Sequence, residues 1–195
     1  MTKIMKTVLW IAGFVILMAT AVFAYNALSD QVKPNIVIEL TPEPEQGGNT
    51  TEDTDREKAP DFTMLDINGN TVKLSDMVGK PIVLNFWASW CPPCKAEMPD
   101  FEKVFGELGD EVQFIMLNLT DGQRETIENG KAFIGDAGYT FPIFFDSMQE
   151  GAYIYGIRSI PTTIFIDKDG YIIASAQGAI DEATLRRGIE LAWGE

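Results

Sequence analysis

The sequence predicts an α/β domain built around a parallel pair of strands, and three segments indicate it. Residues 82–86 form a short apolar, β-branched run that is typical of a buried strand. A helical pattern follows, in which apolar residues recur three and four positions apart and would share one face. They are Met98, Phe101, Phe105 and Leu108. Residues 112–118 again resemble a strand, and this strand–helix–strand order predicts a parallel, right-handed pair.

Shorter segments around this unit are predicted as further elements of the same domain. Residues 62–66 and 71–74 flank an Asn-Gly turn, which predicts a β-hairpin ahead of the core. Towards the C-terminus we expect a helix over 123–137, a strand over 141–145, a helical turn over 149–155, antiparallel strands over 162–167 and 171–176, and a last helix capped by Asp181.

The only two cysteines of the chain lie where the central strand meets the helix. Cys91 directly precedes Pro92, and proline is favoured at the first position of a helix. The N–H groups and the positive dipole end of that helix would stabilise a thiolate, and such a setting lowers a cysteine pKa to roughly 3.5–7.5. Cys94 follows one helical turn later and would face Cys91. One thiol can then attack a disulfide while the other resolves the mixed disulfide.

Two other roles of a Cys-x-x-Cys pair are disfavoured by the sequence. A structural zinc site needs two further ligands, usually Cys or His, and the chain has no histidine and no third cysteine. We therefore expect no metal and no other cofactor. Two cysteines that act only as small buried apolar residues would not need the strand–CxxC–helix context or the two prolines between them.

Composition and charge limit the classes of partner. The 195 residues provide one domain plus appendages, and a hydrophobic fraction of 46% is enough for a core. The net charge is −14, from 29 acidic against 15 basic residues. Since nucleic-acid binding requires a basic face, we expect no nucleic-acid partner.

The N-terminal segment has the pattern of a membrane anchor. Residues 7–29 contain no charge and no proline, and at about 1.5 Å per residue they are long enough to cross a hydrocarbon core of roughly 30 Å. Lys3 and Lys6 precede the run and acidic residues follow it, which places the bulk of the chain outside the cytoplasm. We expect residues 1–29 to be a single-pass anchor in the cell membrane. The alternative is a signal peptide cleaved after Ala24.

Residues 30–58 differ from both neighbouring segments. They are acidic, rich in proline and glycine, and their only apolar patch lies at 36–38. We interpret them as a flexible linker that holds the domain off the membrane. Residues 59–195 then form the domain.

Several stretches along the domain resemble one known family. Asn85-Phe86-Trp87-Ala88-Ser89-Trp90-Cys91-Pro92-Pro93-Cys94-Lys95 resembles the active-site signature of thioredoxin-like proteins, in particular the membrane-anchored TlpA/ResA-type thiol–disulfide oxidoreductases. Residues 59–62, 74–76 and 79–80 are similar to the first part of that domain, and residues 155–157, 160–167 and 170 to its cis-proline loop and hairpin. The resemblance implies a thioredoxin-like fold with an N-terminal β-hairpin and a helix–strand insert, preceded by one transmembrane helix.

The resemblance also implies roles for individual residues. It makes Cys91 and Cys94 a catalytic, redox-active disulfide. It predicts a cis bond before Pro161, which would pack against this pair, and it makes the backbone of Ile160 a binding site for an extended substrate. We expect a substrate groove lined by Trp90, Pro92, Pro93, Ile160 and Pro161. Trp87 is predicted to pack in the core.

The proton acceptor for Cys94 is not assigned by the sequence. Plain thioredoxin has a buried acid at the position of Asn85, which cannot titrate. ResA-type proteins carry a glutamate between the two cysteines, where this chain has Pro92. Glu97 and Glu150 are candidates by position, although each is predicted to be a solvated carboxylate because Glu is mostly exposed.

The sequence therefore predicts an extracytoplasmic thiol–disulfide oxidoreductase. The resemblance implies a reductase of protein disulfides, for example in cytochrome c maturation or spore-envelope assembly, that is reduced again by an upstream membrane thiol donor. A peroxiredoxin-type peroxidase is one alternative, although Leu84 and Ala88 stand where that chemistry uses Thr and Pro. A Cu(I) chaperone is the other, although such carriers of this fold add a histidine and space their cysteines more widely.

Overall fold

The computed structural model describes residues 10, 14, 17, 18, 20, 37–39 and 56–194. The chain divides into two units after Pro34. In the first unit, Trp10, Phe14 and the three other described residues are helical and exposed, and the rest of the predicted anchor over 1–29 lies outside the described residues. Among the residues that are described, no helix is long and apolar enough to cross a membrane.

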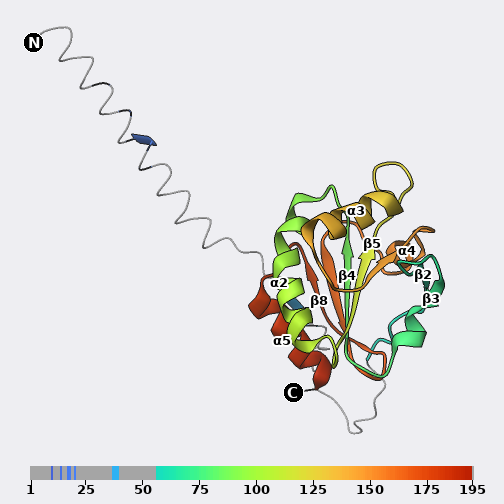
Figure 1. Cartoon of the computed structure of the whole chain (residues 1–195). Coiled ribbons are helices and arrows are strands. Elements are labelled where there is room, and N and C mark those ends of the chain that lie inside the picture. Colours follow the sequence, from blue (N-terminus) through green and yellow to red (C-terminus); the bar gives the residue numbers. More distant parts are fainter. Residues whose placement is uncertain are drawn as a thin grey trace, which may run out of the picture. The chain divides into compact units, whose positions relative to one another are not determined.

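The second unit is built on a mixed sheet, in which the structure describes eight strands (Figure 1). They are β1 (Val37–Glu39), β2 (Thr63–Leu65), β3 (Thr71–Lys73), β4 (Ile82–Trp87), β5 (Gln113–Asn118), β6 (Ile143–Phe145), β7 (Thr162–Ile166) and β8 (Ile172–Gln177). Their order across the sheet is β1-β8-β7-β4-β5-β6-β2-β3. Strand β4 lies at the centre, parallel to β5 and antiparallel to β7, so the predicted strand–helix–strand unit is confirmed.

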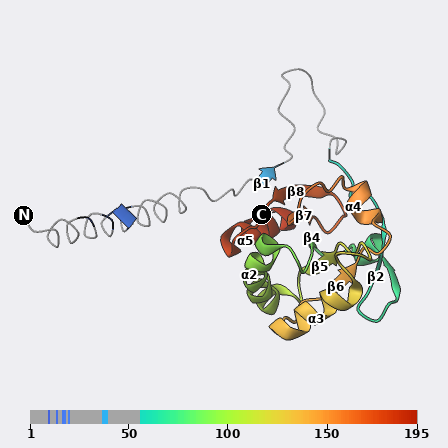
Figure 2. The ribbon, with the colours of Figure 1, turned by 90° about the horizontal axis from the view of Figure 1, so that it is seen from above.

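Helices cover both faces of this sheet. They are η1 (Leu74–Met77), α2 (Pro92–Leu108), α3 (Ile127–Ala137), α4 (Glu150–Ile154) and α5 (Glu182–Trp193). Figures 1 and 2 show α2, α3 and α5 on one face and α4 on the other, while the β2–β3 hairpin extends the sheet beyond β6 at its edge. Side chains of β4 alternate between two cores: Val83 and Trp87 pack under α2 and α5, whereas Leu84 packs under the hairpin.

The predicted helix and hairpin patterns are confirmed with two adjustments. The apolar stripe of α2 faces the core, and Asp181 caps α5 by accepting the N–H of Thr184. Helix α3 begins at Ile127 rather than at 123, because the Asp121 carboxylate holds the preceding residues in a turn and Thr126 supplies the cap. In α5 the buried stripe ends on Ala192, and Trp193 is 36% exposed.

Strand β1 and helix η1 were not predicted. Strand β1 lies inside the span interpreted as a linker, yet it pairs antiparallel with β8, with Val37 opposite Ala176. Lys58, at the other end of that span, forms a bridge with Tyr171. Residues 40–55, which hold most of the Pro and Gly of the predicted linker, lie outside the described residues.

Candidate active site

The two cysteines sit at the junction of β4 and α2, where the sequence places them. Cys91 is the N-cap of α2, and its Sγ accepts the backbone N–H of Cys94 at 3.3 Å. The two residues are joined by a disulfide, with their Cα atoms 5.3 Å apart. Cys94 is fully buried and Cys91 is 3% exposed, while Pro92 and Pro93 between them are exposed. A helix N-terminus therefore points its free N–H groups at the sulfur of Cys91, which stabilises a thiolate there.

The loop before β7 completes the surroundings of the disulfide. The Ile160–Pro161 peptide bond is cis, as expected. The carbonyl oxygen of Ile160 lies 3.7 Å from Sγ of Cys91, which brings together two residues that are far apart in the sequence. Pro161 is buried and Ile160 is half-buried, so part of Ile160 lies at the surface close to the sulfur.

The two tryptophans near the cysteines have different surroundings. Trp87 is fully buried and packs against Phe133, with ring centroids 5.7 Å apart, which confirms its predicted place in the core. Trp90 is 37% exposed. The guanidinium of Arg124 lies over its ring, 3.4 Å from the centroid. Trp90 therefore forms part of the surface next to Cys91, and a charged side chain that the sequence did not predict for this site lies on it.

Glu97 lies one helical turn after Cys94, and the prediction that its carboxylate is solvated is wrong. Its carboxyl is 2% exposed rather than solvated. It accepts hydrogen bonds from the side-chain amide of Asn85 at 2.9 Å and from the N–H of Ile180 at 3.0 Å. Burial raises the pKa of Glu97 to about 8, with the nearby charge of Asp100 adding to the rise and the two hydrogen bonds opposing it.

The other candidate acid lies away from the disulfide. Glu150 belongs to α4, on the opposite face of the sheet, and its carboxylate accepts the backbone N–H of Thr63 in β2 at 3.1 Å. It is half-buried and links α4 to the hairpin. Of the two candidates, Glu97 alone shares the helix and the buried environment of Cys94. The i,i+3 spacing from Cys94 was the sequence signal that would have favoured it.

A second buried carboxylate supports the turn that carries the cysteines. Glu125 is fully buried. It accepts the hydroxyl of Ser89 at 2.7 Å and the side-chain amide of Asn118 at 2.7 Å. Ser89 lies two residues before Cys91, so this carboxylate holds the active-site turn against the end of β5. No local pattern predicted this contact, because the partners lie 36 residues apart.

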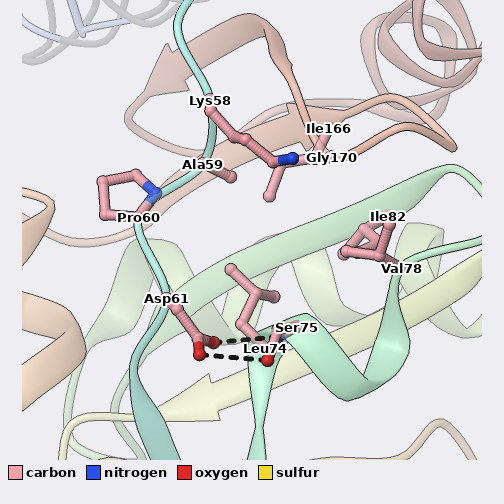
Figure 3. Close-up of a pocket in the computed structure, with 10 residues that line it drawn as sticks. All are labelled: Lys58, Ala59, Pro60, Asp61, Leu74, Ser75, Val78, Ile82, Ile166 and Gly170. Atoms are coloured by element: carbon pink, nitrogen blue, oxygen red, sulfur yellow. Dashed lines mark hydrogen bonds between the residues drawn. The ribbon is translucent and has the colours of Figure 1, made fainter.

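A cavity of about 380 Å³ lies at the opposite end of β4 (Figure 3). Its walls are mostly apolar and include Leu74, Val78 and Ile82. Asp61 at its edge accepts hydrogen bonds from the N–H and hydroxyl of Ser75. Because Ile82 begins β4 and Cys91 follows the end of that strand, this cavity is separate from the disulfide.

Comparison with known proteins agrees with this geometry. A family model described as the AhpC/TSA family matches residues 56–175. The chain belongs to this family. Among curated relatives, the thiol-disulfide oxidoreductase ResA of Halalkalibacterium halodurans is 35% identical over 136 residues, covering 69% of this chain and 75% of ResA. The thioredoxin-like protein YneN of Bacillus subtilis is 29% identical over 182 residues, covering 93% of this chain and 97% of YneN.

Similarity to a solved structure indicates which kind of AhpC/TSA protein this chain resembles. The crystal structure of StoA from Bacillus subtilis superposes with a TM-score of 0.58 at 31% identity, covering 66% of this chain and 96% of StoA. Together with the ResA relatives and the Cys91–Cys94 pair, this shows a ResA-like oxidoreductase of the thioredoxin fold. The predicted family resemblance, α/β fold and class of enzyme are confirmed.

Proposed function

We propose that this chain is an extracytoplasmic reductase of protein disulfides. The observation that carries the proposal is the position of Cys91. It caps helix α2, forms a disulfide with Cys94 and lies 3.7 Å from the carbonyl oxygen of Ile160. This arrangement supplies a stabilised thiolate, a resolving thiol and exposed backbone for a partner at one point of the surface.

The reaction begins from the reduced pair. The Cys91 thiolate attacks one sulfur of a partner disulfide, and the other partner sulfur leaves as a thiolate. Cys94 then attacks Sγ of Cys91 in the mixed disulfide, which releases the second partner thiolate and forms the Cys91–Cys94 disulfide seen in the structure. Two electrons pass to the partner, so the pair must be reduced again before the next cycle.

Glu97 takes the proton that Cys94 has to lose before it attacks. The two residues are one turn apart on α2, and both are buried, so water has little access to the thiol. A carboxylate whose conjugate acid has a pKa of about 8 is a much better acceptor than an ordinary glutamate, because its proton affinity approaches that of a thiolate. The proton moves from Sγ of Cys94 to Glu97 in its ionised form, which is the minor form below pH 8 and becomes more abundant as the pH rises towards 8.

The partner binds in an extended conformation along the loop before Pro161. The backbone of Ile160 offers strand-like hydrogen bonds, and Trp90, Pro92 and Pro93 form the opposite wall of the groove. The proposed substrates are the classes that the family resemblance implies, namely the haem-attachment cysteines of apocytochrome c or a protein of the spore envelope.

The proposed location follows from the sequence of the N-terminal segment. Residues 1–29, as a single-pass anchor, would hold the domain at the outer surface of the cell membrane. A thiol donor in the same membrane would then supply the two electrons for each cycle. Residence in the membrane fraction after an alkaline carbonate wash supports the anchor, and a soluble product that begins at Tyr25 contradicts it.

Trapping of the mixed disulfide tests the function. In the full-length chain, Cys94→Ala keeps the attacking thiol and removes the resolving one, so partners should stay bound through Cys91 and be released by dithiothreitol. The matched Cys91→Ala variant should retain no partner. Equal trapping by both variants would contradict the assigned roles.

Two further assays separate the alternative activities. The unmodified chain should reduce insulin disulfides at a rate well above that of either cysteine variant. Turnover of a hydroperoxide without insulin reduction would instead favour a peroxidase, although the buried Leu84 and Ala88 offer that chemistry no hydroxyl beside Cys91. Binding of Cu(I) without disulfide reduction would favour a metal carrier.

A further inference from the structure

The loop between β5 and α3, residues 119–126, is fastened to the active-site turn. The hydrogen bonds from Ser89 and Asn118 to the buried Glu125 carboxylate are both 2.7 Å long. A buried carboxylate needs such bonds, because it is costly to remove from water without them. The loop therefore has one fixed position relative to Ser89 and hence to Cys91.

The tip of this loop is held from two further directions. Oδ1 of Asp121 accepts the N–H groups of Gln123 and Glu125 at 2.8 and 2.9 Å, which closes the tip into a turn. The side-chain amide of Gln149, which precedes α4, donates to the carbonyl oxygen of Thr120 at 3.0 Å. These contacts leave residue 124 at a defined point of the surface.

Arg124 is placed by this loop on the face of Trp90. Its guanidinium carbon lies 3.4 Å from the ring centroid, within the range of a cation–π contact. Stacking occupies the face of the guanidinium and leaves the N–H groups at its edge available, in a fork that matches a carboxylate. Within residues 56–194, Arg124 forms no salt bridge with a carboxylate.

Two other exposed cations are close in sequence to the residues of the site, although the chain as a whole is strongly acidic. Arg158 precedes Ile160 by two residues, and Lys95 follows Cys91 by one turn of α2. Of the nearby acids, Glu97 and Glu125 are buried, while the exposed Asp121 accepts backbone N–H groups, which lower its pKa together with the charge of Arg124. The exposed guanidinium of Arg124 on Trp90 is therefore a positive charge beside Cys91 in a chain of net charge −14, and it attracts acidic groups to this point of the surface.

We propose that Arg124, seated on Trp90, is a specificity-determining residue that selects protein disulfides with an Asp or Glu beside the reacting cysteine. The inference rests on the proposed disulfide reduction and names its substrate class. A carboxylate near the partner cysteine would pair with the edge of the guanidinium while the partner backbone lies along Ile160. The pairing accelerates formation of the mixed disulfide and is weakened by salt.

Three disulfide peptides that differ at one position test the proposal. They carry Asp, Asn or Lys next to the same cysteine, and the rate constant for oxidation of the reduced full-length chain is measured with each. The Asp peptide should react about two- to fivefold faster than the Asn peptide at low salt, the size expected of one exposed ion pair, and the Lys peptide more slowly. The Asp-to-Asn ratio should approach one at 0.5 M NaCl.

The variant Arg124→Gln should bring the Asp-to-Asn ratio close to one at low salt. The matched control is Arg187→Gln, which removes another exposed cation, from α5, and should leave the ratio unchanged. A ratio of one in the unmodified chain, or a ratio that survives in Arg124→Gln, would overturn the proposal. Failure of the chain to reduce even the Asn peptide would instead overturn the proposed reductase function, so the two failures are distinguishable.

Discussion

The side-chain amide of Asn85 donates one hydrogen bond to Glu97 at 2.9 Å and a second to the hydroxyl of Thr163 at 3.0 Å. All three groups are buried. Asn85 lies on the central strand β4, Glu97 lies one turn beyond the disulfide, and Thr163 is two residues after Pro161. The asparagine that replaces the buried acid of plain thioredoxin therefore does not titrate, but it fixes the position of the carboxyl that does.

The raised pKa of Glu97 predicts a pH dependence of stability. The carboxyl binds its proton with a pKa of about 8 in the folded chain, against 4.5 for an ordinary glutamate. Below pH 4.5 both states are protonated and there is no penalty. Between pH 4.5 and 8 the unfolded state has lost the proton and the folded state keeps it, so the free energy of unfolding from this group falls by about 1.4 kcal/mol per pH unit.

Urea unfolding of the oxidised chain at several pH values between 5 and 8 measures this slope. Glu97→Gln should flatten it, because the amide does not titrate, and should gain stability relative to the unmodified chain as the pH rises. Glu128→Gln, an exposed position in the first turn of α3, is the control and should preserve the slope. Parallel curves for Glu97→Gln and the unmodified chain would show that the carboxyl is not protonated in the fold.

The same substitution should separate the two chemical steps of the reaction. Attack by Cys91 on an aromatic disulfide such as Ellman's reagent releases one coloured thiolate, and attack by Cys94 on the resulting mixed disulfide releases a second. Glu97→Gln should slow the second release by roughly 10²-fold, the lower end of what a positioned base contributes, and leave the first nearly unchanged. Equal slowing of both releases would mean that Glu97 acts on the fold of the site rather than on Cys94.

The contact between Glu125 and Ser89 predicts a large coupling in stability. Glu125→Ala leaves the half-buried hydroxyl of Ser89 and the buried amide of Asn118 without their acceptor, which should cost about 1–3 kcal/mol. Ser89→Ala should cost less, and the double variant should cost less than the sum of the two single changes. Chemical unfolding of the four chains gives the coupling, and additive costs would show that the two side chains do not interact.

Much of the fold follows from local patterns in the sequence. The apolar run before Cys91 and the helical stripe that includes Met98 and Phe101 specify β4 and α2, because each pattern fixes which face is buried. The position of Cys91 at the helix N-terminus follows from Pro92 alone. The family resemblance added the cis bond before Pro161, which no local pattern gives.

The groups that tune the site were harder to predict, because their partners are distant in the sequence. Glu97 was expected to be solvated, since glutamate is mostly exposed, and its burial depends on Asn85 and on Ile180, 83 residues away. Arg124 and Glu125 were placed in a predicted helix, whereas Asp121 holds them in a turn beside Trp90 and Ser89. Strand β1 was hidden by the acidic, proline-rich composition around it.

Packing of α5 on the sheet provides the last prediction. Gly188 is buried in the middle of this helix, and a Cβ atom at that position would overlap the ring of Phe165 in β7. The ring is itself fully buried, so it has no free space into which to move. Gly188→Ala should therefore lower the free energy of unfolding by about 1–3 kcal/mol, as overpacking does in a dense core.

Gly106→Ala is the matched control. A Cβ on this exposed residue of α2 meets nothing within 4 Å, so the substitution should raise the free energy of unfolding by about 0.5–1 kcal/mol through helix propensity. Opposite shifts of the urea midpoint for the two alanine variants would confirm that α5 lies directly against β7, and a stabilising effect of both would show that the helix stands further from the sheet.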